Sequence, residues 1–267
     1  MPRKIEAMAS ARLTGTQSIE RALTLLREIA AHNRAGSRLL DLATRTGLQR
    51  PTVHRMLKCL ATESMVQQDA DSHRYFLGPM VFELGLTATP RYNLRETCHP
   101  ALTRIAEATG DTVFLTQRSG LDSVCLDRRE GAFPIKTFTL EIGMRRPLGV
   151  GTGSLAILSA LPEDEIQKVV GANSGRLPEY GLNPGALIAQ VKRSQKLGYA
   201  MREVPGLAGV RSVGQVLRNQ SGIAFAALSV STITSRMSEK RATEVAQLLK
   251  SESRQIERQL ATGSDHR

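Results

Sequence analysis

An acid-free segment, residues 42–62, constrains the fold of this chain more than any other stretch. Its second half carries apolar residues at i, i+3, i+4 and i+7: Val53, Met56, Leu57 and Leu60. That spacing predicts a helix that begins near Arg50 and buries one face. A shorter helix over 39–45 is expected to end at Gly47, because glycine readily adopts the left-handed conformation that terminates helices. Two helices joined in this way, with the small Ala43 four residues before the glycine, predict a helix-turn-helix.

The opposite side of the second helix is cationic. The residues expected there, facing outward or to the flanks, are Arg50, Pro51, Thr52, His54, Arg55 and Lys58. A solvated helix face would show the same charges, so the charges alone are weak. Together with the Ala43/Gly47 spacing they favour DNA, since a helix about 10–12 Å across fits a major groove about 12 Å wide.

The expected contacts divide into two kinds. Arg50 and Arg55 can each reach guanine O6 and N7, and Gln49 can read adenine. The residues expected to contact phosphates, which add affinity without sequence information, are Arg45, Thr52 and Lys58. For His54, a base contact and an ordinary surface position remain equally open.

A β-hairpin is expected after this helix. Two short extended runs, 65–68 and 73–77, flank a polar tetrad over 69–72, which is typical of a hairpin. Three helices and a hairpin predict a winged helix-turn-helix over residues 16–78, preceded by a flexible tail over 1–15. In the wing, His73 and Arg74 are candidates for a minor-groove or phosphate contact.

The first of the three helices is expected over 18–32, with Ser18 as its N-cap. The apolar residues assigned to its buried face are Ile19, Ala22, Leu23, Leu26 and Ala30. Gly36 then interrupts the helical pattern.

A linker helix is expected within residues 79–93, and a second domain over 94–262. The helices expected in this domain cover 94–109 and 155–161 and begin at 162, 184 and 238. The expected strands are 112–118, 123–129, 134–140, 199–204, 210–218 and 223–231. Their order predicts an α+β domain in which helices flank a mainly antiparallel sheet.

Composition narrows the class of protein. The chain has 267 residues, a formal net charge of +11 and 41% hydrophobic residues, which suffices for two domains with cores. It contains no apolar run long enough for a membrane span, and its N-terminus lacks the apolar core of a secretory signal. Three widely spaced cysteines fit neither a disulfide framework nor a zinc site. We therefore expect a cytoplasmic protein without a bound metal, cofactor or membrane, in which Cys98-His99 has a structural or surface role.

The glycine-rich segment 149–154 (GVGTGS) could form either a nucleotide site of an enzyme or a binding site for a small metabolite. It lacks the lysine of a P-loop and the third glycine of the dinucleotide fingerprint, and no G-x-S-x-G or H-E-x-x-H pattern occurs. An enzyme is therefore disfavoured. The alternative to a regulator is a small-metabolite-binding protein, or an enzyme that uses this loop.

Five stretches in this order resemble the IclR family of transcriptional regulators over nearly the whole chain. They are "SIERALTLL" (18–26), "DLATRTGLQRPTVHRML" (41–57), "RYFLGP" (74–79), "PLGVGTGSLAIL" (147–158) and "GIAFAALSVS" (222–231). The resemblance implies a winged helix-turn-helix, a linker helix and a GAF-like effector-binding domain. It also implies a homodimer or tetramer that binds an inverted-repeat operator and responds to a small metabolite.

The resemblance also implies where the effector binds. The positions carried over are Gly151, Thr152, Gly153, Ser154, Ser212, Ser229 and Ser231, with Arg202 or Glu203 where the family often has an acidic residue. A glycine-rich turn that opens a helix presents free amides to a carboxylate, and serines at alternate strand positions share one face. We therefore expect an organic acid, although a tight turn without a ligand would show the same glycines.

Overall fold

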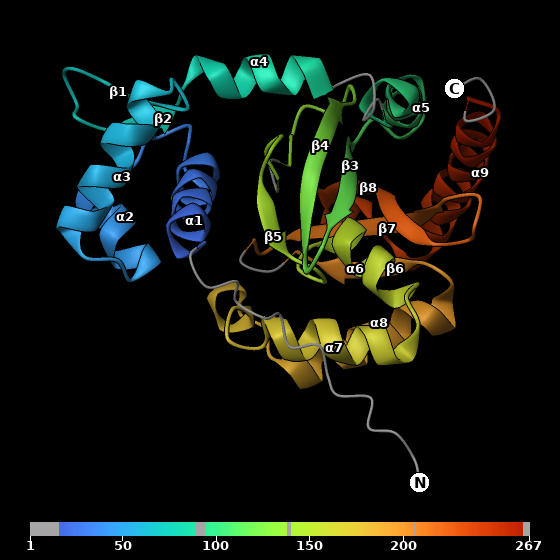
Figure 1. Ribbon diagram of the computed structural model, residues 1–267. Helices are drawn as coiled ribbons and strands as arrows, with labels where there is room; N and C mark the ends of the chain where they lie inside the picture. Colours follow the sequence, from blue (N-terminus) through green and yellow to red (C-terminus); the bar gives the residue numbers. More distant parts are fainter. Residues whose placement is uncertain (1–15, 89–93, 138–139, 205–206, 264–267) are drawn as a thin grey trace, which may run out of the picture. The chain divides into compact units, whose positions relative to one another are not determined.

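The computed structural model describes residues 16–88, 94–137, 140–204 and 207–263 (Figure 1). The expected tail, and residues 89–93 of the expected linker, lie outside these ranges. The chain divides into two compact units, residues 1–91 and 92–267. Each unit is described by itself below.

The first unit combines four helices and a two-stranded hairpin among its described residues. In chain order they are α1 (Gln17–Ala31), α2 (Leu39–Thr46), α3 (Arg50–Thr62), β1 (Val66–Gln68), β2 (Tyr75–Leu77) and α4 (Pro79–Ala88). One core joins α1, α2, α3 and the hairpin, and it is centred on Leu25, Leu42 and Leu57. The predicted winged helix-turn-helix is confirmed.

The turn between α2 and α3 follows the predicted geometry. Gly47 caps α2 with φ 68°, in the left-handed region where side chains with a Cβ are strained. Thr46 is half-buried before this turn, and its hydroxyl donates to the Leu42 carbonyl oxygen at 2.6 Å. Pro51 lies in the first turn of α3, where a missing amide hydrogen costs no helical bond.

The buried face predicted for α1 is confirmed at Leu26, which packs against the core, and wrong at Ile19, Leu23 and Ala30, which are exposed. Leu25 and Ile29 are fully buried, whereas Ile19 is 61% and Leu23 45% exposed. The helix carries apolar residues on two adjacent faces, and periodicity alone cannot say which of them meets α2 and α3. The predicted cap is also wrong, because the helix begins after Thr16 and Ser18 lies inside it.

The second unit is built on a six-stranded antiparallel sheet with the order β5-β4-β3-β8-β7-β6. Its strands are β3 (Thr112–Ser119), β4 (Asp122–Glu130), β5 (Arg145–Pro147), β6 (Ala200–Glu203), β7 (Val210–Arg218) and β8 (Ala224–Ile233). Its helices are α5 (Leu94–Thr109), α6 (Thr152–Ser159), α7 (Glu163–Asn173), α8 (Pro184–Leu197) and α9 (Glu239–Gly263), with 3-10 turns at Leu177–Tyr180 and Thr234–Arg236.

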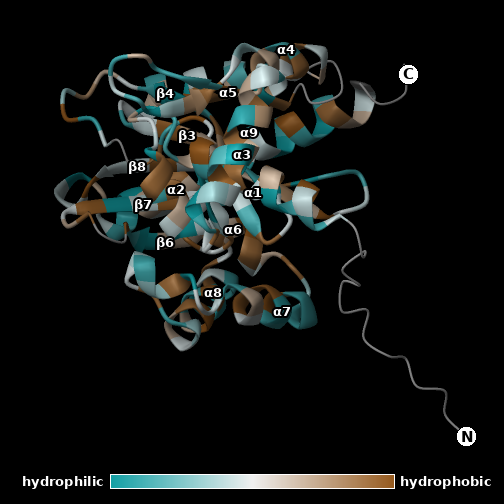
Figure 2. Cartoon of the chain, turned by 60° about the vertical axis from the view of Figure 1, so that its left-hand side comes forward, coloured by the Kyte–Doolittle hydropathy of each residue, from teal (hydrophilic) through white to brown (hydrophobic). Residues whose placement is uncertain are grey.

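Helices cover both faces of this sheet (Figure 1). One core places α5 and α9 against the sheet, around Ile105, Leu228 and Leu249. The other joins α6, α7 and α8 to the opposite face, around Leu155 and Ala227. Figure 2 shows apolar and hydrophilic residues alternating along α9, as expected of a helix with one buried side. We call the face of the sheet that packs against α6, α7 and α8 the α6 face.

One predicted strand is wrong. Residues 134–137 and 140 form no strand, and positions 138–139 lie outside the described residues. The strand that pairs with β4 is β5, whose Arg146 lies opposite Ser123. Within 134–137, the buried Thr137 hydroxyl donates to the Ser231 carbonyl oxygen at 3.0 Å.

Candidate functional site

The outer face of α3 is an exposed cationic surface. The predicted DNA-contacting residues that are exposed are Arg45, Gln49, Arg50, Pro51, His54, Arg55 and Lys58. Thr52 is half-buried at the start of the helix. Val53 and Leu57, at 0% and 1% exposure, fix the opposite side of α3 in the core, so the helix presents this face without rearrangement.

No carboxylate compensates the charge of this surface within the described residues. The ion pairs of the structure involve Arg95, Arg104 and other cations of the second unit. Arg45, Arg50, Arg55 and Lys58 therefore keep their full charge toward solvent, which suits a polyanionic partner.

The wing has fewer free cationic donors than its sequence indicates. The Arg74 guanidinium donates to the carbonyl oxygens of Ala35 at 3.3 Å and Gly36 at 3.0 Å. Asp69 lies at the exposed hairpin turn, and hydrogen bonds from the side chain and backbone of Ser72 lower the pKa of its carboxyl. The ionised Asp69 opposes a phosphate contact there, so DNA contact by Arg74 stays a prediction.

The α6 face of the sheet gathers the predicted effector residues of the strands. Ser212 on β7 lies opposite Ser231 on β8, and their hydroxyls are hydrogen-bonded. Ser229 lies two residues along β8, opposite Gly214. All three serines are buried, with exposures of 2–3%, and they share one face as the alternation predicts.

The first turn of α6 lies close to this face. A Cβ on Gly153 would lie 3.0 Å from Thr116 Oγ1 and 3.4 Å from Ser229 Oγ, so a larger residue would push the helix away. The Gly149 amide donates to Ser154 Oγ at 2.7 Å. Gly151 is the N-cap and contributes no side-chain cap, and the first amides of a helix have no acceptor within it.

Arg202 is a buried cation on this face. It is 8% exposed on β6, opposite Ser212, and its Nη1 donates to the Gly149 carbonyl oxygen at 3.1 Å. Burial alone lowers the pKa of its guanidinium to about 10, so it remains charged at neutral pH without a nearby carboxylate. Glu203, the neighbouring candidate, is exposed and lies 3.8 Å from Arg211.

Unpaired polar atoms concentrate where α6 meets the sheet. Seven buried side-chain polar atoms of the described residues have no hydrogen-bond partner. Three of these are Thr116 Oγ1, Thr152 Oγ1 and Arg202 Nε. A buried unpaired group costs about 1–3 kcal/mol, so these three atoms leave unused hydrogen-bonding capacity beside α6.

A closed cavity lies beside the first turn of α6. Its lining includes the predicted Gly151 and Ser154, and five residues that the sequence reasoning did not select: Thr116, Ser123, Cys125, Leu140 and Met144. The other predicted residues line the same face but not this cavity. Ser123 and Cys125 alternate along β4, and this alternation was a usable signal. The cavity measures ≈ 10 Å³, about the space of one water.

Arg146 also lines the cavity. Burial is the main cause that lowers the pKa of its guanidinium. The guanidinium carbon lies 5.9 Å from the centre of the Tyr180 ring. A second cation is thus within reach of a ligand that enters here.

Cys98-His99 has structural contacts. Cys98 is fully buried in α5, and burial raises the pKa of its thiol to about 12. His99 Nδ1 lies 3.2 Å from Asp127 Oδ2. In the part of the chain that the structure describes, no group of three His, Cys, Asp or Glu residues could hold a metal ion.

Comparison with known proteins decides the family. Residues 18–70 match the IclR helix-turn-helix domain, and residues 86–258 match the family described as bacterial transcriptional regulator IclR C-terminal. The chain belongs to the IclR family. It is therefore a DNA-binding transcriptional regulator with an effector-binding C-terminal domain, as the resemblance implied.

Individual IclR relatives cover almost the whole chain. This chain is 28% identical over 253 residues to the HTH-type transcriptional regulator BhcR of Paracoccus denitrificans, and the alignment covers 94% of this chain and 90% of that protein. An IclR transcriptional regulator from Alicyclobacillus acidocaldarius shares the fold at a TM-score of 0.74 and 22% identity, over 91% of this chain and 98% of the other.

An IclR homologue from Microbacterium hydrocarbonoxydans, solved in complex with 4-hydroxybenzoate, aligns with a TM-score of 0.71 at 19% identity. The alignment covers 92% of this chain and 99% of that one. Across the helices of the described residues, we find none with the length and apolar character needed to cross a membrane.

Proposed function

We propose that the chain binds an inverted-repeat operator through α3 and releases or tightens it in response to an organic acid bound at the α6 face. The observation that carries the proposal is the buried Arg202, which has no carboxylate partner among the described residues and lies among unpaired hydroxyls beside the first turn of α6. The chain would act by binding and not by turnover, in keeping with relatives that are named as regulators.

On DNA, α3 would lie in the major groove with its first residues at the base edges. Arg50, Arg55 and Gln49 would read bases, and Arg45, Thr52 and Lys58 would hold phosphates. Support comes from the exposure of these side chains, Thr52 excepted, and from the missing acidic partners. Pro51 and His54 flank the same surface.

An inverted repeat requires two copies of α3, so we propose a homodimer or a tetramer. The first unit leaves apolar side chains exposed on α1 and α4: Ile19, Leu23, Phe82, Leu84 and Leu86. Their exposures range from 45% to 68%, and such exposed apolar groups mark interaction surfaces. Phe82→Ser should therefore shift the sedimentation coefficient toward the monomer, whereas Leu121→Ser, at an exposed turn of the second unit, should not.

The effector would be a carboxylic acid. Free amides at the start of α6 and the Arg202 and Arg146 guanidinium groups favour an anion, and serine hydroxyls can donate to its oxygens. The Microbacterium relative binds 4-hydroxybenzoate, which supports a small aromatic acid as one candidate. Because the cavity measures ≈ 10 Å³, binding would require α6 or its covering residues to move.

That movement gives the acid a means of control. A ligand that prefers the rearranged form shifts the equilibrium between two arrangements of the protein. A typical coupling of about 1–3 kcal/mol would change operator affinity about 5–150-fold.

The test has two stages. A thermal-shift screen of small aromatic and aliphatic carboxylic acids, each paired with its neutral amide, should find an acid whose amide has no effect. That acid should then change the operator dissociation constant measured by fluorescence anisotropy. Stabilisation by acid and amide alike, or an unchanged operator affinity, would contradict the proposal.

A further inference from the structure

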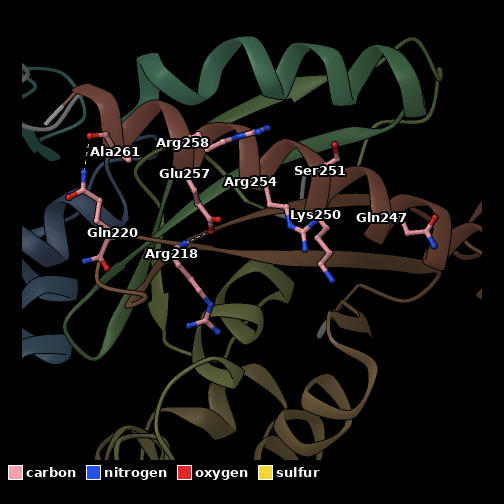
Figure 3. A pocket seen from close by; sticks show the side chains of 10 residues that line it. Arg218, Gln220, Gln247, Lys250, Ser251, Arg254, Glu257, Arg258 and Ala261 are labelled. Atoms are coloured by element: carbon pink, nitrogen blue, oxygen red, sulfur yellow. Dashed lines mark hydrogen bonds between the residues drawn. The ribbon is translucent and has the colours of Figure 1, made fainter. Parts of the chain in front are cut away.

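A second uncompensated cationic surface lies on α9. Lys250, Arg254 and Arg258 recur at every fourth residue on its exposed side, which spaces them about 6 Å apart along the helix axis. With Arg218 at the end of β7 they line an open groove of ≈ 690 Å³. Figure 3 shows the side chains of Lys250 and Arg254 extending from α9 toward the strand that carries Arg218.

Two acidic residues lie in this half of α9: Glu252 is paired outside the groove, whereas Glu257 is one carboxylate among the four cations that line it. Glu252 Oε2 lies 2.6 Å from Arg104 Nη2 on α5. Glu257 Oε1 accepts a hydrogen bond from the Arg218 backbone amide at 2.7 Å. Within the described ranges, Lys250 and Arg254 form no ion pair. The groove therefore presents a net positive charge to solvent.

The helix itself does not account for this pattern. Like charges four residues apart destabilise a helix. Cations near a helix C-terminus are favourable only within about the last turn, and α9 continues to Gly263, more than two turns beyond Arg254. An external anion is the simplest compensation.

The lining favours one kind of anion. The groove contains no aromatic residue, whereas single-stranded nucleic acid is bound by stacking of bases on aromatic rings. It is open along its length, whereas small-molecule sites enclose their ligands. The amide side chains of Asn219 and Gln247 line it as well, and these both donate and accept hydrogen bonds, as a polypeptide backbone requires.

We propose that this groove docks an acidic segment of another protein, with carboxylates spaced about 6 Å apart, as on a helix with Asp or Glu at every fourth position. The interaction is separate from operator and effector binding and does not depend on either proposal. It would give the regulator a protein partner through its second unit.

The test uses the full-length protein and a fluorescein-labelled helical peptide with glutamate at every fourth position. The same peptide with glutamine is the ligand control. The Lys250→Glu/Arg254→Glu variant should bind the acidic peptide at least about tenfold more weakly than wild type, which corresponds to a loss of about 1.4 kcal/mol of binding free energy. The matched Lys192→Glu/Lys196→Glu variant, with the same spacing on the exposed side of α8, should bind like wild type.

Three outcomes would overturn the proposal. Equal weakening by both variants would show attraction by net charge alone, and an unchanged affinity would show that the groove is not used. If the α9 variant instead weakens binding of a non-operator duplex and leaves the peptide unaffected, the groove contacts DNA. Thermal unfolding of both variants identifies any loss of fold, and Lys250→Gln/Arg254→Gln then replaces the charge reversal.

Discussion

The cations of the α3 surface and Arg202 on the α6 face have no carboxylate partner among the described residues, but they differ in exposure. Arg55 on α3 lies in solvent, where water stabilises its charge, whereas Arg202 is 8% exposed and has one unpaired nitrogen. The DNA-binding surface is therefore complete before DNA arrives. The proposed effector site would store an energetic cost that a ligand would remove, so its occupancy would drive a change of conformation.

The largest expected effect is a loss of operator affinity on substitution in α3. Arg55→Ala should weaken operator binding by about 1–3 kcal/mol in each half-site and relax specificity at one base pair, because a bidentate guanine contact is lost. Anisotropy titrations against the operator and its single-base variants measure both quantities. Lys192→Ala on α8 is the control. Unchanged specificity would show that Arg55 does not read a base.

At Arg202 we expect removal of the cation to stabilise the protein, whereas removal of Arg55 weakens operator binding. Arg202→Met should raise the free energy of unfolding without acid, because relief of a buried, partly unpaired guanidinium, about 1–3 kcal/mol, outweighs loss of its hydrogen bond to the Gly149 carbonyl, about 0.5–1.5 kcal/mol. It should also abolish the stabilisation by acid, which is about 2.7 kcal/mol at 100 times the dissociation constant. Thermal unfolding with and without the acid measures both effects.

Arg211→Met is the matched control for Arg202, since Arg211 lies on the adjacent strand and pairs with exposed acidic residues. Loss of such surface pairs costs about 0–1 kcal/mol, and the acid response should persist. If Arg202→Met destabilises the protein without acid, then Arg202 is a structural residue and the effector assignment fails.

A smaller effect is expected at Lys58, which tests the phosphate contacts of α3. Lys58→Ala should weaken operator and non-operator DNA about equally, and should reduce the slope of log affinity against log salt by about 1, because one phosphate contact is lost. Titrations over a range of salt concentrations measure this slope. Lys196→Ala should leave it unchanged. A change in sequence preference would instead place Lys58 at a base.

The smallest effect is expected at Thr116. Thr116→Val removes an unpaired buried hydroxyl and keeps the shape of the side chain, so the free energy of unfolding should rise by about 0.5–1 kcal/mol. Affinity for the acid should fall if this hydroxyl binds it. Thr112→Val, at another buried position of β3, provides the comparison. Destabilisation at Thr116 would indicate a hydrogen bond that the structure does not show.

Sequence reasoning predicted most of the fold because local chemistry decided it. The stop at Gly47, the Pro51 helix start and the alternating serines of β8 each follow from one residue type or a short period. The strand predicted over 134–140 was wrong because an extended segment becomes a strand only when it can hydrogen-bond to the edge strand of a sheet. The buried face predicted for α1 was wrong in part because two apolar faces competed for one core.

The amino-acid sequence by itself determined that this chain carries an acid-free cationic helix and a glycine-rich turn, since charge and backbone freedom belong to residues. Only the tertiary structure decided which of those charges are buried. Burial depends on which segments meet, and the contact between β6 and the turn before α6 places Arg202 at the Gly149 carbonyl. The same contact singles out Arg202, and not Glu203, as the main candidate for effector recognition.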